Sequence, residues 1–142
     1  MDFSGAQQFH SAPQQVWNAL HNPAILKESI PGARDVTITG NQIAITLHIS
    51  LPMIGGDVTL APTIKQEQPP QHAVLAINYV SDVSTLKGDV TIDLATDGAG
   101  TRLTYAAQLH LTGRIGVADN IVGKTAAQTG LNHFFKNLEQ KV

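Results

Sequence analysis

The chain of 142 residues contains no cysteine. A disulfide framework, a cysteine-ligated zinc or iron–sulfur centre and a cysteine nucleophile are therefore all excluded. Domains usually span roughly 100–200 residues, and a core of that size needs no covalent cross-link. We therefore expect residues 1–142 to form one domain.

Charged residues are also scarce. They make up 14% of the chain, compared with about 25% in an average domain. The 9 basic and 11 acidic residues give a net charge of −2, which is unsuited to a phosphate backbone and argues against nucleic-acid binding. The hydrophobic fraction of 42% is ordinary for a folded domain, so the composition does not indicate disorder.

Long apolar runs are absent as well. The first residues, from Met1 to Gly5, do not combine a basic segment with an apolar one, as a signal peptide would. No stretch approaches the roughly 18 apolar residues of a membrane span. We therefore expect a soluble, cytoplasmic protein.

The first third of the chain predicts a strand followed by two short helices. Larger and smaller or polar residues alternate over residues 3–9, which is typical of a strand. Ser11, with Gln14 three residues later, has the spacing of a capping box and predicts a helix start. Asn22 followed by Pro23 predicts a second helix start.

The middle of the chain, residues 35–113, alternates apolar and polar residues with a period of two. This pattern predicts about six antiparallel strands with one covered and one exposed face. Gly98-Ala99-Gly100 is followed by a strand rather than a helix, so we interpret it as a turn and not as a phosphate loop. From about Arg114 to the end the period becomes helical, which predicts one long helix.

These elements predict an α+β fold in which a curved antiparallel sheet of six to seven strands wraps around the C-terminal helix. That helix carries small residues on one side, and small side chains cannot fill a wide curved face. We therefore expect an apolar cavity between helix and sheet. The residues expected to line it are Leu47, Ile49, Leu75, Tyr79, Val90, Tyr105 and Leu109 from the sheet, and Val122 and Phe134 from the helix.

Met53 and Ile54 interrupt two strands with apolar residues. The interruption is compatible with a lip at the mouth of the cavity, with a contact surface for a membrane or a partner, or with a simple bulge. We retain both residues as candidates for the cavity mouth.

Catalytic groups are hard to find on the inner face. By alternation, the Asp and Lys residues considered in the strands (Lys65, Lys87, Asp89 and Asp93) fall on the outer face. The inward polar groups reduce to the hydroxyls of Tyr79 and Tyr105, with Thr125, Thr129 and His133 added if the helix is suitably rotated. We assign no catalytic residue, although a small enzyme using Tyr79, Tyr105 or His133 for proton transfer stays open.

Metal and nucleotide cofactors are not expected. The six histidines include no i, i+4 pair and no His-x-His within a strand. Residues 118–125, ADNIVGKT, differ from a phosphate-binding loop only at the first glycine, but Ile121 and Val122 stiffen the backbone that would cradle a phosphate. After Thr125 only 17 of the 142 residues remain, too few for a further strand to bring a Mg²⁺ ligand.

Several motifs occur along the chain in an order that resembles the CoxG-like family, named after the CoxG component of carbon monoxide dehydrogenase. They are Phe3-Ser4-Gly5, Ala12-Pro13-x-x-Val16-Trp17-x-x-Leu20, Pro23-x-x-Leu26, Ile30-Pro31-Gly32, Gly100-Thr101-Arg102-Leu103-x-Tyr105, Gly113-Arg114-Ile115-Gly116 and Phe134-Phe135-x-x-Leu138. The resemblance implies the helix-grip fold of the START and birch-pollen-allergen-like superfamily, in the order β-α-α-β6-α around an apolar tunnel. It also implies an accessory role beside a molybdenum hydroxylase, through membrane recruitment or the handling of a quinone- or lipid-like molecule.

Two features depart from the family pattern. The chain ends at Val142 without the membrane-associated tail of longer members, so we expect at most peripheral contact with the inner face of the membrane. Ala33 stands where relatives often have cysteine. The resulting hypothesis is a non-catalytic binding protein for a hydrophobic small molecule, accessory to a carbon monoxide dehydrogenase-type redox complex. The alternatives are a cavity enzyme of the polyketide cyclase/dehydratase type and a pure protein-docking module.

Overall fold

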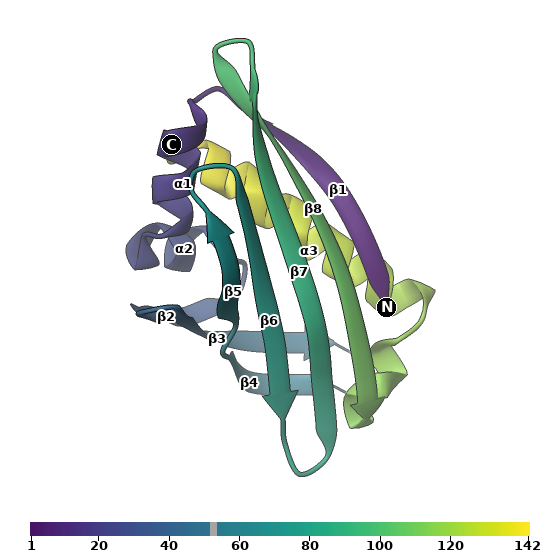
Figure 1. Cartoon of the computed structure of the whole chain (residues 1–142). Coiled ribbons are helices and arrows are strands. Elements are labelled where there is room, and N and C mark those ends of the chain that lie inside the picture. The colour runs from purple at the N-terminus through teal and green to yellow at the C-terminus, as the bar shows by residue number, and fades with distance from the viewer. Residues whose placement is uncertain (52–53) are drawn as a thin grey trace.

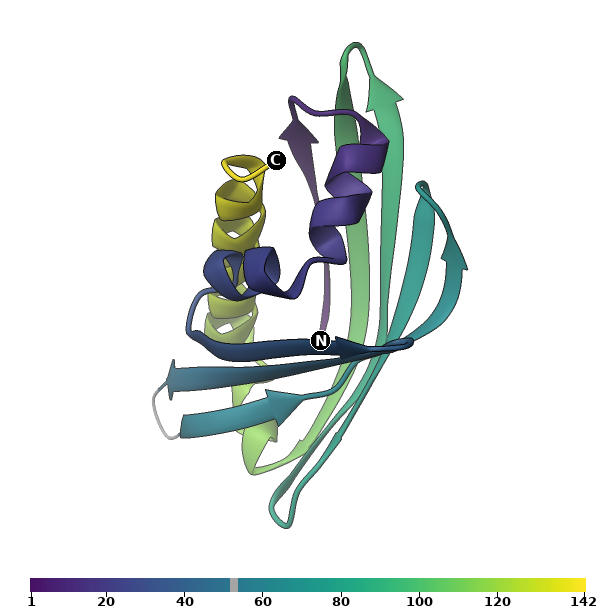
Figure 2. The same cartoon turned by 90° about the vertical axis from the view of Figure 1, so that its left-hand side faces the viewer.

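The computed structural model describes residues 1–51 and 54–142, which form an α+β fold (Figure 1). A long antiparallel sheet is bent so strongly that its two arms run nearly across each other, and the α-helices all lie on its concave side (Figure 2). The elements in chain order are β1 (Asp2–Phe9), α1 (Pro13–Leu20), α2 (Pro23–Ser29), β2 (Ala33–Thr39), β3 (Gln42–Leu51), β4 (Ile54–Leu60), β5 (Thr63–Gln68), β6 (His72–Val80), β7 (Ser84–Asp97), β8 (Gly100–Gly113), a 3₁₀ helix (Arg114–Ala118) and α3 (Ile121–Glu139).

The strand order β1-β8-β7-β6-β5-β3-β2 confirms the predicted antiparallel sheet. β4 pairs with β3 beside β5, with Ile45 opposite Leu60 and Gln42 opposite Thr63. β4 and β5 thus act as one strand interrupted next to Pro62, and counting them together reduces the eight described strands to seven. β1 closes the sheet by pairing with β8 over its whole length.

The first helix begins one residue later than predicted. Ala12, not Ser11, is the N-cap residue, and the side chain of Gln15, not Gln14, accepts a hydrogen bond from the Ala12 N–H at 3.2 Å. The carbonyl oxygen of Ser11 instead accepts a 2.8 Å hydrogen bond from the buried hydroxyl of Thr101 on β8. This contact between distant segments fixes Ser11 outside the helix, which local spacing alone could not show.

The second helix begins where Asn22-Pro23 predicts. The Asn22 side-chain oxygen accepts hydrogen bonds from the N–H groups of Ala24 and Ile25, at 3.0 and 3.2 Å. Such an N-cap satisfies amide groups that the first turn of a helix leaves without an intrahelical partner.

The C-terminal helix begins later than predicted. Residues from Arg114 to Ala118 form a separate 3₁₀ turn, and α3 starts only after Asn120, whose side chain accepts a 2.9 Å hydrogen bond from Gly123. A side chain at Gly123 would collide with the carbonyl oxygen of Ala118. The motif that resembles a phosphate loop is therefore a sharp chain reversal followed by a capped helix start.

The densest part of the core lies beside α1. Phe9, Val16, Leu103 and Leu138 are fully buried there and come from β1, α1, β8 and α3. Trp17 packs in the same cluster. In the described part of the chain, no helix is both long and apolar enough to cross a membrane.

Candidate functional site: an apolar cavity between sheet and helices

A cavity of about 470 Å³ lies between the concave face of the sheet and the helices. Its walls come from β1, from strands β3 to β8, from α1 and α2, and from the middle of α3. Most lining side chains are aliphatic or Phe, and only Trp17, His21 and Tyr105 carry a side-chain nitrogen or oxygen. Such a lining suits a ligand that is mainly hydrocarbon.

The structure brings together most of the residues that the sequence predicted to line a cavity. Five come from the inner face of the sheet, where alternation placed them, and one comes from α3. These residues are Leu47, Leu75, Val90, Tyr105, Leu109 and Phe134.

Three predicted residues do not line the cavity. Tyr79 shares the inner face with the lining residue Ile77 but lies two positions closer to the β6–β7 turn, beyond the end of the cavity. Ile49 is similarly displaced along β3 from Leu47. Val122 is 74% exposed, because α3 starts one residue before it and its first turn does not reach the sheet.

The predicted mouth cannot be assigned. Met53 lies outside the described residues, and Ile54 begins β4. The mouth at these residues therefore stays a prediction.

Helical residues of the cavity wall were missing from the predicted set. Leu20 and Leu26, from α1 and α2, line the cavity, and so does the half-buried Leu131 of α3. Their spacing marks them as apolar helix positions, but only the packing of the helices on the sheet shows that they face the cavity.

The hydroxyl of Tyr105 lies between β1 and α3. It accepts a hydrogen bond from the side-chain amide of Gln128, while its ring stacks on Phe135 with 5.2 Å between ring centres. A side chain at Gly5 on β1 would come within 2.6 Å of this hydroxyl. Tyr105 thus presents its ring to the cavity, and its polar end ties the sheet to the helix.

His21 is the second polar residue of the wall. Its ring lies 4.9 Å from the Trp17 ring, and its Nε2 lies 2.7 Å from Oε1 of Glu67 on β5. The sequence placed His21 at the end of a helix but could not predict this partner 46 positions away.

Comparison with family models finds a match over residues 5–142 to the model described as the CoxG component of carbon monoxide dehydrogenase. The chain belongs to the CoxG family. Among curated proteins the comparison finds no match.

Solved structures share the fold of this CoxG-family chain. A conserved protein from Geobacillus kaustophilus is 21% identical, with a TM-score of 0.88 over 99% of this chain and 94% of that one. A START superfamily protein from Mycobacterium smegmatis is 15% identical, with a TM-score of 0.76 over 99% and 96% of the two chains. A protein from Rhodobacter sphaeroides is 18% identical, with a TM-score of 0.74 over 99% and 90%. These likenesses confirm the START-like helix-grip fold.

The candidate proton donors of an enzyme do not converge in this CoxG-family cavity. Tyr105 lines it, Tyr79 lies beyond its end, and His133 is exposed on α3, as are Thr125 and Thr129. Within the described residues, no group of three or more His, Asp or Glu side chains could hold a metal ion.

Titratable groups gather instead on the outer face. Lys65 pairs with Asp89 at 3.1 Å, while Asp57 contacts both His48 at 2.9 Å and Arg34 at 3.2 Å. The hydrogen bond from His48, assisted by the charge of Arg34, lowers the pKa of Asp57 below its usual value. The outer-face prediction for Lys65, Lys87, Asp89 and Asp93 agrees with their strand register.

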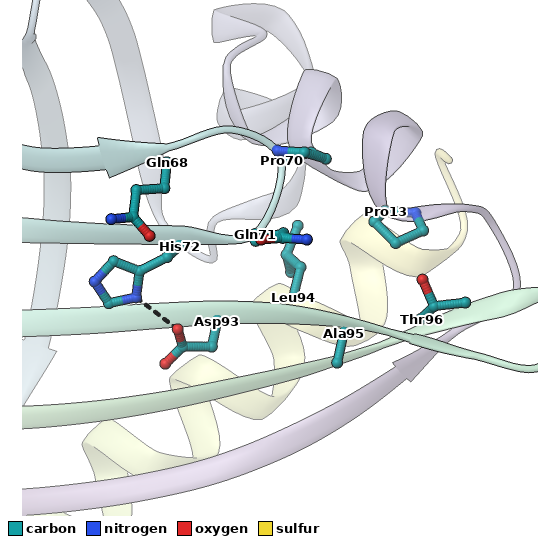
Figure 3. A pocket seen from close by; sticks show the side chains of 9 residues that line it. All are labelled: Pro13, Gln68, Pro70, Gln71, His72, Asp93, Leu94, Ala95 and Thr96. Carbon is teal, nitrogen blue, oxygen red and sulfur yellow. Dashed lines mark hydrogen bonds and ion pairs between the residues drawn. The ribbon is translucent and has the colours of Figure 1, made fainter.

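A second hollow of about 630 Å³ lies outside the sheet, below the β5–β6 turn (Figure 3). Its wall includes Gln68, Thr96 and the ion pair between His72 and Asp93, whose atoms Nδ1 and Oδ1 are 2.6 Å apart. This hollow is polar, and its His–Asp pair lies on the face opposite the apolar cavity. It offers no counterpart to the hydrocarbon lining of the inner cavity.

Proposed function

We propose that the protein binds a hydrophobic small molecule, quinone- or lipid-like, without transforming it, and acts as an accessory to a redox enzyme complex of the molybdenum hydroxylase type. The observation that carries the proposal is the 470 Å³ cavity with its almost entirely carbon lining. Its volume falls within the range of about 300–1,000 Å³ typical of small-molecule sites. Membership of the CoxG family supports the association with a carbon monoxide dehydrogenase-type partner.

The binding step is tested by native mass spectrometry of the purified protein, followed by solvent extraction and analysis of the extracted molecules. We expect a bound apolar species of defined mass. A protein that is empty under gentle conditions and takes up no apolar molecule from a mixture of lipids and quinones would contradict the proposal.

A pair of variants on α3 locates the binding site. Ala127→Phe places a ring in the cavity wall and should displace the bound molecule, because the added volume occupies the space that the ligand needs. Val122→Phe adds a similar ring on an exposed part of the same helix and should leave the bound fraction unchanged. Equal loss of ligand in both variants would place binding elsewhere.

Association with a redox complex needs its own measurement. Affinity capture with a candidate molybdenum hydroxylase, compared between ligand-loaded and empty protein, should recover the complex. Capture that fails in both states would remove the partner from the proposal and leave ligand binding in place.

A further inference from the structure

The His21–Glu67 ion pair spans the side of the cavity, between the helical corner and β5. His21 caps the C-terminal end of α1 and also lines the cavity. Its side chain is 35% exposed and that of Glu67 is 34% exposed. A residue that faces both the cavity and solvent marks a place where the interior approaches the surface, so the pair stands at a lateral opening.

A β-bulge in β5 aims Glu67 at this position. Pairing with β6 runs from Ile64 opposite Leu75 to Gln66 opposite Val74, so that Lys65 is the extra residue. Glu67 then stands opposite Ala73, which lines the cavity, and directly opposed residues share one face of a sheet. Without the bulge, alternation from Ile64 would turn Glu67 outward. Bulges commonly redirect a side chain in this way.

Both ring nitrogens of His21 face hydrogen-bond acceptors. Nδ1 lies 2.8 Å from the backbone carbonyl oxygen of Trp17, and Nε2 lies 2.7 Å from the carboxylate of Glu67. A carbonyl oxygen and an ionised carboxylate only accept, so both contacts need the protonated imidazolium. A neutral ring has one N–H and must give up either the anchor to α1 or the contact with β5.

Other charged groups nearby are directed elsewhere. α1 has no charged residue, and on α2 Glu28 pairs with Lys141 while Lys27 is exposed. On β5, Lys65 pairs with Asp89. Charged residues of β7 and β8 lie on the outer face, namely Lys87, Asp89, Asp93, Asp97 and Arg102. The contact between the helical corner and β5 therefore depends on the proton of His21.

We propose that the His21–Glu67 pair is a pH-sensitive gate on the apolar cavity. It holds the helical corner against β5 while His21 is protonated, and it releases the corner when the ring becomes neutral. The inference rests on the proposed function, since a gate matters only if the cavity takes up a ligand. Exchange should accelerate as the pH rises through about 6.5, where histidine side chains ordinarily lose their charge.

The gate is tested with N-phenyl-1-naphthylamine, an uncharged fluorescent probe whose own protonation does not change between pH 5.5 and 8. Stopped-flow fluorescence gives its association and dissociation rates with the full chain. For the wild type we expect both rates to rise about two- to fivefold between pH 5.5 and 8, the range that a partly exposed ion pair supports. Because both rates change together, the equilibrium affinity should change little.

Glu67→Gln should remove the pH dependence and give the fast rates throughout, because an amide can neither attract the imidazolium as strongly nor repel the neutral ring. Asp93→Asn is the matched control, since it weakens a His–carboxylate pair on the outer face, away from the cavity. This variant should keep the wild-type pH profile.

Each outcome is informative. Probe binding with rates that do not depend on pH, or an unchanged profile in Glu67→Gln, would refute the gate and leave the proposed function standing. Loss of the profile in Asp93→Asn would also refute it. A wild-type protein that binds no probe would refute the proposed function itself, and the gate with it.

Discussion

At the end of the molecule that holds α1, helices cover the concave face of the sheet, and Phe9, Val16, Leu103 and Leu138 are completely buried. We call these four residues the packed end. At the opposite end, the row formed by Tyr79, Leu86 and Leu111 on adjacent strands is only half-buried. The packed end is at the top of Figure 1, and the opposite end includes the β6–β7 turn.

We call that second region the open end: the row Tyr79, Leu86 and Leu111 together with the exposed Val117, Ile121 and Val122. The strands alternate in the same way at both ends, so the inner side chains are equally apolar. The difference arises because α3 starts too late to cover the open end. An apolar inner face therefore becomes core only where another element lies across it.

The largest expected effect comes from truncating the packed end. Leu138→Ala should lower the free energy of unfolding by about 2–5 kcal/mol, because it removes contacts and leaves a void in a fully buried site. Leu111→Ala, at the open end, should cost roughly 1 kcal/mol, since much of that side chain's surface stays in contact with water. Urea denaturation measures both. Equal losses would contradict the comparison.

A smaller effect is expected at the contact between Gly5 and Tyr105. Gly5→Ala places a methyl group 2.6 Å from the tyrosine hydroxyl oxygen and 2.8 Å from Cζ, so strain of about 1–3 kcal/mol should appear as a lower denaturation midpoint. Adding Tyr105→Phe removes the nearer atom and should recover part of the loss. Additive losses in this double-mutant cycle would show that the two residues do not interact.

Surface substitutions at the open end should change stability least. Ile121 is 84% exposed and Val122 is 74% exposed, so Ile121→Ser and Val122→Ser should alter the free energy of unfolding by no more than about 0.5 kcal/mol. Thermal unfolding is a sufficient measurement. A loss of several kcal/mol in either variant would mean that the first turn of α3 is buried in solution.

The outer face near the open end provides a pH-dependent test. Because the folded-state pKa of Asp57 is lowered, its contribution to stability is present above the ordinary value of 3.8 and is lost as the pH falls through the lowered value. His48→Ala removes the principal cause and should shift the Asp57 carboxyl titration, followed by NMR, to higher pH. An unchanged titration would assign the lowering to Arg34 instead.

Much of the sheet and part of the site could be predicted from the sequence. Alternation correctly separated inner from outer residues over most strands, and six of the nine predicted lining residues surround the cavity. Tyr79, Ile49 and Val122 were misplaced because alternation indicates the face of a side chain but not the length of the cavity. Trp17 and His21 were missed because helix residues join the wall only after the helices have packed.

Glu67 shows the limit most clearly. Its direction depends on a one-residue bulge at Lys65, and the bulge depends on how β5 pairs with β6. No local pattern in the sequence records that shift of register. The contact with His21 further requires two segments 46 positions apart to meet at one side of the cavity.

The absence of cysteine, the low charge and the two periodicities determined by themselves that this chain forms one domain with an antiparallel sheet and a final helix, because those properties depend on neighbours in the sequence. Only the tertiary structure decided where the cavity ends, which apolar side chains remain open to water and which carboxylate turns inward. Burial and pairing depend on what lies across the sheet, and that is set by packing between segments far apart along the chain.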